Sequence, residues 1–389
     1  MRTHVSSTDV AVDRPKLRVR TVRRGNAHFK LGVDLGQRNA TYVARTMTLR
    51  RYLNSMQAVA IAPEPGYDLL HCVNAIPILT RRPYVISFEN FLPRVPEDTY
   101  IAWLERWLQR RLLRDVRTGR CLALFALSRF GRRQFRHQNK DFPGLEQIDR
   151  KVEILYPTIE ATGTPKPHSP RISLLLVGFN FMGKGGPALL RAHERLRAQR
   201  LPVDTYIVSS LQWSADDFLG PPSREYVEQE LKRLTLDGVT HHRRLPNEEV
   251  LALMRNVDYL VFPTLHDTFG YVAIEALSRG TPVIATDVCA LPEIVDDGRQ
   301  GYLLPFEKDG VGRWRHIYQT PDPAYQGYFE DAIGLLADGI VDAVGKGWEA
   351  RSSYEEMSAA SLERVRKRFS RDYARRRLED AYELARRPT

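Results

Sequence analysis

Two acidic residues frame the start of a predicted helix in the second half of the chain. Asp267 precedes that helix and Glu275 follows eight residues later, both inside the segment 263–277. Backbone N–H groups at the start of a helix favour an anion, and Gly270 would let the chain approach a ligand closely. The two carboxylates could then bind two sets of hydroxyl groups, such as those of a sugar and a ribose. Taken singly, each has a simpler and favoured interpretation, a helix cap for Asp267 and a solvated helix face for Glu275.

The elements that would position these residues alternate between strand and helix. From residue 171 onwards, apolar runs predict strands at 171–178, 203–209, 258–263, 281–286 and 301–305. Between them, helices are predicted at 187–200, at 248–255 with Asn247 as its cap, at 269–279 and at 291–295. This order predicts a doubly wound parallel sheet, which binds ligands beyond the carboxyl ends of its strands. Residues 306–328 lack periodicity and predict an inserted loop, and helices at 327–344 and 352–387 finish the chain.

The first half of the chain also alternates short apolar runs with longer amphipathic ones. Strands are predicted at 17–22, 68–74, 84–88, 121–128 and 152–156, with a helix at 99–116. The polar, proline-rich stretch 157–170 predicts a linker. We therefore expect an α/β protein with one domain in residues 1–160, a second in residues 170–350 and a helical segment in residues 352–389.

The composition favours a globular protein without a membrane-spanning helix. Hydrophobic residues make up 43% of the 389 residues and charged residues 27%, which fits packed cores under a polar surface. No run approaches the roughly 18 apolar residues of a transmembrane helix, and no apolar stretch follows Arg2 and His4 as a secretory signal requires. Cys72, Cys121 and Cys289 lie far apart in apolar runs, as expected of buried free thiols in a reducing compartment. We expect a cytoplasmic protein.

The chain is strongly basic, with a net charge of +11 and a pI near 9.6. The excess gathers between Arg106 and Arg136 and between Arg364 and Arg377. Solvated helix faces, nucleotide substrates, an anionic membrane or nucleic acid would each account for such clusters. The segment 100–114 mixes aromatic, aliphatic and Arg positions at near-helical spacing, so it could lie on an anionic membrane. A core-packed helix with a wet basic face is the slightly favoured alternative.

The segment that carries Asp267 and Glu275 resembles the acid-x7-acid signature of the family-4 retaining glycosyltransferases. The likeness continues through residues 276–298, which follow that family's order of helix, Gly-x-Pro strand, turn and Pro-Glu helix. Residues 301–305 match its closing strand, and residues 177–186 resemble its glycine and lysine loop before the first helix of the C-terminal domain. In all, about a third of the chain, residues 170–305, matches closely.

This resemblance implies the GT-B fold, in which two Rossmann-like doubly wound domains face each other across a cleft. Residues 1–160 would form the acceptor-side domain, residues 170–350 would bind a nucleotide sugar, and the helix of residues 352–389 would cross back to the N-terminal domain. The implied reaction is retaining transfer of a hexose-type sugar from a nucleoside diphosphate to a hydroxyl of a glycan, a glycolipid or a small molecule. Same-face attack, assisted by the leaving phosphate, would involve no protein nucleophile, no divalent metal and no further cofactor.

The resemblance also implies roles for individual residues. Lys184 would contact the diphosphate, where a cation stabilises developing negative charge. Asp267 would hold hydroxyls of the donor sugar and Glu275 those of the ribose. Arg243 and Arg244 would lie beside the base, although a solvated turn explains these arginines equally well. The catalytic set is Asp267, Lys184 and Glu89, and the donor-binding set is Gly178, Asn180, Lys184, Arg243, Arg244, Asp267, Thr268, Phe269, Gly270, Tyr271, Val272 and Glu275.

The donor side departs from the family pattern at several positions. Asp267 replaces the commoner glutamate, so its carboxylate reaches less far, and Thr268 replaces a small glycine. Asn180 and Phe181 stand where many relatives carry an arginine, which leaves Lys184 as the chief diphosphate cation of that loop.

The N-terminal half resembles the family only loosely. Glu89 follows the strand 84–88 where the family usually has a histidine near the reacting sugar. Glu89 could accept a hydrogen bond from the donor sugar, orient an acceptor hydroxyl, or be an ordinary strand-end carboxylate. No clear Gly-Gly loop follows a first strand, which puts phosphate contacts from this domain in doubt.

Three alternatives to a glycan or small-molecule transferase stay open. The same fold could serve a sugar-nucleotide epimerase or hydrolase, or a glycosyltransferase acting on nucleic acid, although no nucleic-acid motif supports the latter. A non-catalytic GT-B module is the third. The acceptor is unknown, and an anionic membrane on which segment 100–114 presents a lipid-linked acceptor is one candidate partner.

Overall fold

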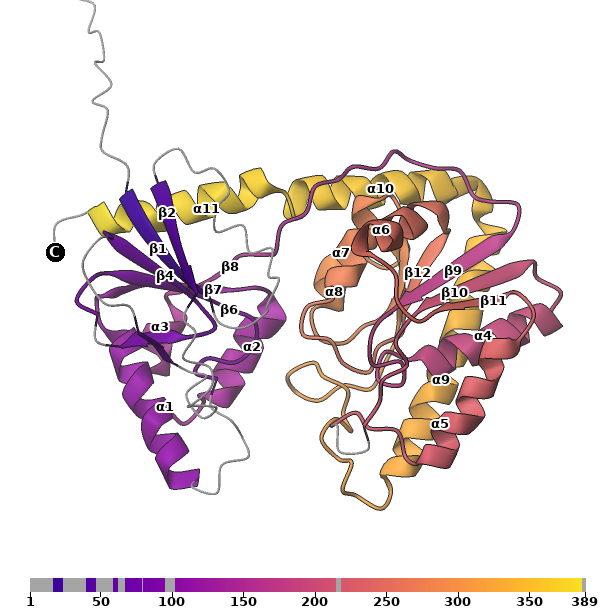
Figure 1. Ribbon diagram of the computed structural model, residues 1–389, viewed down its shortest axis with the longest axis horizontal. Coiled ribbons are helices and arrows are strands. Elements are labelled where there is room, and N and C mark those ends of the chain that lie inside the picture. The colour runs from indigo at the N-terminus through magenta and orange to yellow at the C-terminus, as the bar shows by residue number, and fades with distance from the viewer. Residues whose placement is uncertain are drawn as a thin grey trace, which may run out of the picture.

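The protein folds into two α/β lobes joined by a pair of C-terminal helices (Figure 1). The computed structural model describes residues 17–23, 40–46, 59–61, 67–78, 80–94, 102–214 and 218–386. Each lobe is built around one six-stranded sheet in which every pairing is parallel.

The sheet of the C-terminal lobe has the strand order β11-β10-β9-β12-β13-β14. Its strands are β9 (Ile172–Val177), β10 (Val203–Val208), β11 (Val239–His242), β12 (Tyr259–Phe262), β13 (Val283–Thr286) and β14 (Gly301–Leu304). Its helices are α4 (Gly186–Ala198), α5 (Arg224–Leu231), α6 (Asn247–Asn256), α7 (Tyr271–Ser278), α8 (Leu291–Ile294) and α9 (Tyr325–Glu349). The strand order reverses between β9 and β12, which confirms the predicted doubly wound sheet.

Two details of this lobe differ from the sequence-based prediction. The backbone of Pro246, not of Asn247, occupies the N-cap position of α6, and no side chain caps this helix. The predicted loop 306–328 ends earlier, because α9 begins at Tyr325; within the loop the Trp314 ring is buried and stacks on Phe306. Strand β11 and helix α5 were not predicted.

The sheet of the N-terminal lobe has the strand order β2-β1-β4-β6-β7-β8. Its strands are β1 (Leu17–Arg23), β2 (Ala40–Thr46), β4 (Leu69–Val73), β6 (Tyr84–Phe88), β7 (Cys121–Ala126) and β8 (Val152–Ile154), and β3 (Val59–Ile61) pairs separately with β5 (Ile76–Ile78). Helices α1 (Ala102–Arg117), α2 (Arg129–Gln138) and α3 (Leu145–Asp149) complete the lobe. Side chains such as Ile86, Phe88, Leu112 and Phe135 form its main core.

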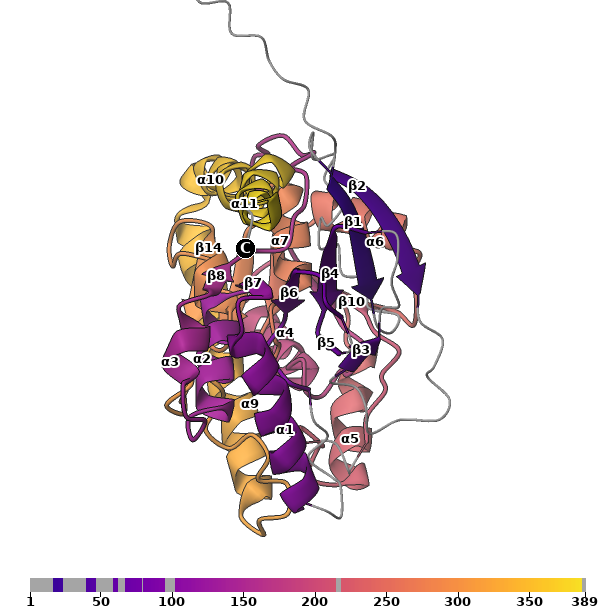
Figure 2. The same ribbon diagram turned by 90° about the vertical axis from the view of Figure 1, so that its left-hand side faces the viewer.

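The C-terminal helical segment returns to the N-terminal sheet. It consists of α10 (Tyr354–Arg368) and α11 (Arg371–Glu383), not of the single predicted helix, because the Ser370 hydroxyl accepts the Tyr373 N–H and begins a new helix. Leu378 and Tyr382 of α11 pack on the face of the sheet opposite α1, as Figures 1 and 2 show. There the His71 ring makes hydrogen bonds with Tyr382 Oη (2.7 Å) and Ser87 Oγ (2.8 Å).

Helix α1 has the predicted amphipathic character. It buries Leu112 and Leu113 while exposing Trp107, Arg110 and Arg114. No helix among the described residues is long and apolar enough to cross a membrane. Association with a membrane surface stays a prediction. The three cysteines are buried free thiols, as predicted.

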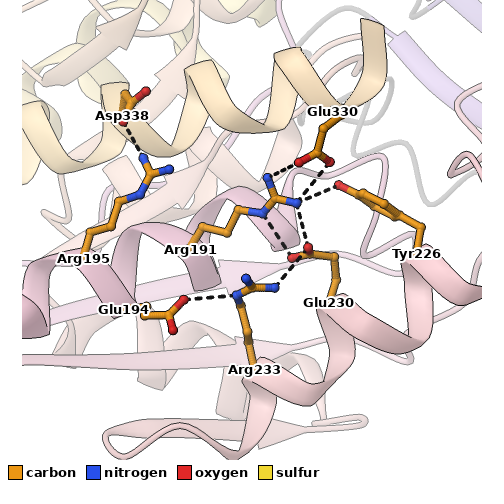
Figure 3. Close-up of polar contacts among 8 residues, drawn as sticks. All are labelled: Arg191, Glu194, Arg195, Tyr226, Glu230, Arg233, Glu330 and Asp338. Atoms are coloured by element: carbon orange, nitrogen blue, oxygen red, sulfur yellow. Dashed lines mark hydrogen bonds and ion pairs between the residues drawn. The ribbon is translucent and has the colours of Figure 1, made fainter. Parts of the chain in front are cut away.

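A buried ion network ties three helices of the C-terminal lobe together (Figure 3). Arg191 of α4 donates to Glu230 of α5 and to Glu330 of α9, each at 2.7 Å. Arg233 also pairs with Glu230 (3.0 Å), whose side chain is only 2% exposed. A buried carboxylate is stable only when its charge is compensated, so Arg191 fixes the packing of these helices.

The network gives a first prediction. Arg191→Ala should lower the free energy of unfolding by about 3 kcal/mol, because Glu230 stays buried with only Arg233 as its cation. Arg195→Ala, which breaks the exposed pair with Asp338 in Figure 3, is the matched control and should change stability by less than about 1 kcal/mol. Urea unfolding would measure both. Equal effects of the two substitutions would contradict the assigned role of Arg191.

Candidate functional site

Lys184 and Asp267, 83 residues apart in sequence, meet at the point where the strand order of the C-terminal sheet reverses. Lys184 lies in the loop after β9 and Asp267 in the loop after β12. The Lys184 ammonium contacts Asp267 Oδ2 (2.6 Å) and the His266 carbonyl oxygen (3.2 Å). Burial opposes ionisation of Asp267, but the Lys184 ammonium outweighs it and holds the pKa of the carboxyl below its usual value. The structure therefore brings the two predicted residues together as an ion pair.

The two loops fit closely against each other. Asn180 Oδ1 accepts the Gly183 N–H (2.9 Å), and the Gly183 carbonyl accepts the Leu265 N–H (3.0 Å). Gly185 has a positive φ of 74°, and a Cβ there would lie 2.1 Å from the Pro263 carbonyl oxygen. Only glycine permits this approach, so the sequence of the loop sets the position of Lys184.

Asp267 also holds the backbone of the loop that leads into α7. Its Oδ1 accepts the N–H groups of Phe269 (3.1 Å) and Gly270 (2.6 Å). The N-cap position of α7 is held by Gly270 and no side chain caps this helix, so Asp267 is not its helix cap. These two N–H groups, predicted as donors to a ligand, are occupied by Asp267 here, so a ligand would have to displace the carboxylate to reach them.

The remaining predicted donor residues lie around this pair. Thr268, Tyr271, Val272 and Glu275 are partly exposed in the Asp267 loop and on α7. Gly178 closes the end of β9 and lies against the Lys184 side chain. Their roles in binding stay predictions.

Glu89 approaches the site from the N-terminal lobe. It follows β6 and forms an ion pair with Arg94 (2.6 Å). Burial raises the pKa of the Glu89 carboxyl, Arg94 opposes that shift, and the negative charge of Asp267 adds to it. Burial, followed by the charges of Glu89 and Asp267, also raises the pKa of Tyr271. The Glu89 carboxyl is therefore close enough to Asp267 to feel its charge, although the two residues belong to different lobes.

A pocket of about 720 Å³ lies next to the loop that carries Lys184, at the carboxyl ends of β9, β10 and β11. Its wall includes both predicted arginines, Arg243 and Arg244, and the ring of Phe179, which is 75% exposed. The other lining residues are Ser210, Gln212, His241 and His242. Sequence reasoning missed Phe179 and Gln212, although Phe179 stands next to Gly178 in the quoted loop and is a bulky apolar residue in a turn. Among the described residues, no cluster of three His, Cys, Asp or Glu side chains is arranged to hold a metal ion.

Comparison with known proteins identifies the architecture. Residues 171–311 match the family model of the glycosyl transferases group 1. This stretch, the group 1 domain, is similar to that family. The solved glycosyltransferase of Rickettsia africae ESF-5 superposes with a TM-score of 0.58 at 14% identity, covering 96% of this chain and all of that one. Anabaena HepE in complex with UDP-glucose gives a TM-score of 0.58 at 13% identity over 95% of this chain and all of that one. The chain has the predicted GT-B fold.

Curated relatives cover less of the chain. The D-inositol 3-phosphate glycosyltransferase of Arthrobacter sp. (strain FB24) is 29% identical over 225 residues, 55% of this chain and 49% of that one. The glycogen synthase of Mycobacterium tuberculosis (strain ATCC 25618 / H37Rv) is 29% identical over 163 residues, 41% of this chain and 36% of that one. The chain thus spans about half the length, or less, of these relatives.

Glu293 of the group 1 domain joins the two lobes of the GT-B fold. Its carboxylate accepts the N–H groups of Arg129 and Phe130, both at 2.7 Å, at the start of α2, and the Tyr156 hydroxyl (2.9 Å). The first N–H groups of a helix have no partner within the helix and carry its positive dipole end. A carboxylate from the opposite lobe therefore satisfies them especially well.

This contact gives the second prediction. Glu293→Ala should weaken the contact between the lobes by about 3 kcal/mol, because three hydrogen bonds to a charged group are lost, two of them from the first N–H groups of α2. The radius of gyration in small-angle X-ray scattering should rise, and Glu293→Gln should give a smaller rise because its amide oxygen still accepts an N–H. Glu307→Ala, which removes an exposed carboxylate, is the control. An unchanged radius in Glu293→Ala would show that other contacts hold the lobes.

Proposed function

We propose that this protein is a retaining, metal-independent glycosyltransferase that moves a hexose-type sugar from a nucleoside diphosphate to an acceptor hydroxyl. The observation that carries the proposal is the Lys184–Asp267 ion pair at the strand-order reversal of a group 1 domain, one short loop away from the pocket that Arg243 and Arg244 line. Open α/β sheets bind their ligands at such a reversal.

The pocket and the ion pair suit the two ends of one donor. The exposed ring of Phe179 offers a face for a base, and the guanidinium groups of Arg243 and Arg244 can contact polar edges or phosphate. Lys184 lies at the far end of the same loop. In this arrangement the base occupies the pocket, the diphosphate crosses the loop to Lys184, and the sugar reaches Asp267. HepE, with its bound UDP-glucose, is a relative in fold that takes such a donor.

Donor binding would exchange the partners of the ion pair. A diphosphate carries more negative charge than one carboxylate, so it competes for the Lys184 ammonium. Asp267 Oδ2 is then released and can accept hydroxyl groups of the sugar. The ion pair thus holds both side chains in place before the donor binds. Afterwards Lys184 contacts the diphosphate and Asp267 contacts the sugar.

The transfer step follows from this placement. The acceptor oxygen attacks the anomeric carbon on the face from which the phosphate departs, the carbon–oxygen bond to phosphate breaks, and the acceptor proton passes to a phosphate oxygen. Lys184 stabilises the negative charge that develops on the diphosphate. Glu89, across the cleft, orients the acceptor hydroxyl. Resemblance to the family-4 enzymes supports the retaining outcome.

The third prediction separates the two members of the ion pair. Lys184→Ala should weaken UDP binding about tenfold to a hundredfold, because a charge-assisted contact to phosphate is lost. Asp267→Asn should bind UDP at least as tightly as the natural protein, because Lys184 is set free, yet transfer from UDP-glucose should fall by a similar factor. Titration calorimetry with UDP and a transfer assay measure the two effects, with the exposed Lys346→Ala as the control. Equal loss of UDP binding in both variants would contradict partner exchange.

The fourth prediction concerns pH. An ordinary glutamate side chain takes up its proton near pH 4.3. Because burial raises the pKa of Glu89, this carboxyl takes up its proton at a higher pH. The transfer rate should therefore fall with decreasing pH already above about pH 4.3, because a protonated Glu89 accepts the orienting hydrogen bond of the acceptor hydroxyl less well. Glu89→Gln should be slower by about tenfold to a hundredfold and should lack this acid limb, whereas the exposed Glu146→Gln should keep it. An acid limb unchanged in Glu89→Gln would remove Glu89 from the mechanism.

A hydrolase or epimerase is the second candidate, because the contacts described on the C-terminal lobe serve the donor alone. Incubation of a donor without acceptor, followed by NMR of the sugar and the nucleotide, distinguishes these reactions. Steady release of free sugar, or its epimerisation, at a rate equal to that of transfer would favour the second candidate.

A further inference from the structure

His266 borders the proposed donor site but has no role in the function proposed above. Its carbonyl oxygen accepts the Lys184 ammonium, and Asp267 is the next residue in the chain. Its ring meets Phe218 edge to face at 5.8 Å between centroids and Phe130 of the N-terminal lobe at 6.4 Å. The imidazole therefore stands where the two lobes meet.

One ring nitrogen of His266 is held by a cysteine. Nδ1 lies 3.2 Å from Sγ of Cys289, which is 3% exposed. Cys289 has a positive φ of 55°, a conformation that side chains other than glycine rarely adopt. The Cys289 N–H donates to the Gly312 carbonyl (2.7 Å), which holds the backbone in this conformation. Such an outlier at a functional site suggests that the side chain is needed there.

The charge states of this pair decide which group donates. Burial lowers the pKa of the His266 imidazole to about 4, with Asp267 opposing and Lys184 adding to the shift. Burial raises the pKa of the Cys289 thiol to about 12. Near neutral pH the ring is thus uncharged and the sulfur carries its proton. A thiol that carries its proton can donate it to Nδ1, and the ring proton then resides on Nε2.

The other ring nitrogen is available to a ligand. Nε2 makes no hydrogen bond within the described part of the chain, and it is not one of the buried polar atoms there that lack a partner. The His266 side chain is partly exposed. A carboxylate can only accept hydrogen bonds, whereas a neutral imidazole N–H donates one.

We propose that Cys289 fixes the Nε2–H tautomer of His266, and that His266 donates this N–H to a hydroxyl of the bound sugar next to the hydroxyl that Asp267 accepts. Cys289 acts as a positioning residue and His266 as a ligand contact. Adjacent acceptor and donor groups would recognise neighbouring hydroxyls of a hexose. The tautomer assignment rests on the contact between Cys289 Sγ and His266 Nδ1 together with the charge states of this pair, and the sugar contact rests on the proposed function.

The tautomer is tested by NMR of the full chain with ring-15N histidine. His266→Gln identifies the His266 signals among those of the ten histidines. Near neutral pH, His266 should show a protonated Nε2 and an unprotonated Nδ1. Cys289→Ser, which keeps an O–H donor, should retain this pattern. Cys289→Ala should shift both nitrogen resonances towards the average of the two tautomers.

Two further variants separate this effect from a folding defect. Cys289→Gly adopts the positive φ without strain and removes the thiol, so it should lose the fixed tautomer while remaining folded. Cys121→Ala, which removes a buried thiol in the N-terminal lobe, should leave the His266 signals unchanged. A protonated Nδ1 in the natural protein, or unchanged His266 signals in Cys289→Ala and Cys289→Gly, would overturn the assignment.

The sugar contact is tested with UDP and UDP-glucose as probes. Bound UDP-glucose should shift the Nε2–H resonance of His266, and bound UDP should not, because only the sugar reaches this nitrogen. An equal shift with both ligands, or none with bound UDP-glucose, overturns the contact. If neither probe binds, the proposed function and the sugar contact with these probes both fail, whereas the variants above still decide the tautomer.

Discussion

The alignment of the two lobes depends on the carboxylate of Glu293. Its oxygens bind the first N–H groups of α2 and the hydroxyl of Tyr156, while its carbonyl oxygen accepts Arg364 (3.0 Å) and Arg368 (2.8 Å) of α10. One residue thus contacts the N-terminal lobe, the linker and the C-terminal helices. A buried carboxylate is tolerated only while its hydrogen bonds are made, so the lobes cannot slide without losing several at once.

Within the C-terminal lobe, the order of the strands brings the residues of the candidate site together. Loops after β9 and β12 lie side by side only because the sheet reverses its order between these strands. The glycine at 185 then lets one loop touch the backbone of the other, and Lys184 reaches Asp267 as a result. A preformed ion pair limits how far either side chain must move when a donor binds, which is the physical meaning of preorganisation.

Sequence patterns predicted what depends on local signals. Continuous apolar runs bounded by Gly or Pro predicted β9, β12 and β13, and family resemblance predicted Lys184 and Asp267 as neighbours of one ligand. Strand β11 escaped notice because its residues Val239–His242 are only partly buried and two of them are histidines. The contact of His266 with Cys289 could not be predicted, because no spacing rule reports which loops a fold brings together. A cysteine in an apolar run indicates burial, but nothing in its identity indicates a left-handed backbone.

The ordered loop 305–324 links the conformation of Cys289 to the position of α2. Asp309 Oδ1 accepts the N–H groups of residues 311, 312 and 313, so the loop keeps its own shape. Consecutive carbonyl groups of this loop then face in two directions: Val311 O accepts Arg133 Nε of α2 (3.1 Å), and Gly312 O accepts the Cys289 N–H (2.7 Å). Because Arg133 and the residues held by Glu293 belong to the same helix, separation of the lobes would break both contacts together while leaving Cys289 in place. Both contacts of the C-terminal lobe therefore fall on the same helix, α2, whereas the contact of Cys289 with Gly312 lies within the C-terminal lobe.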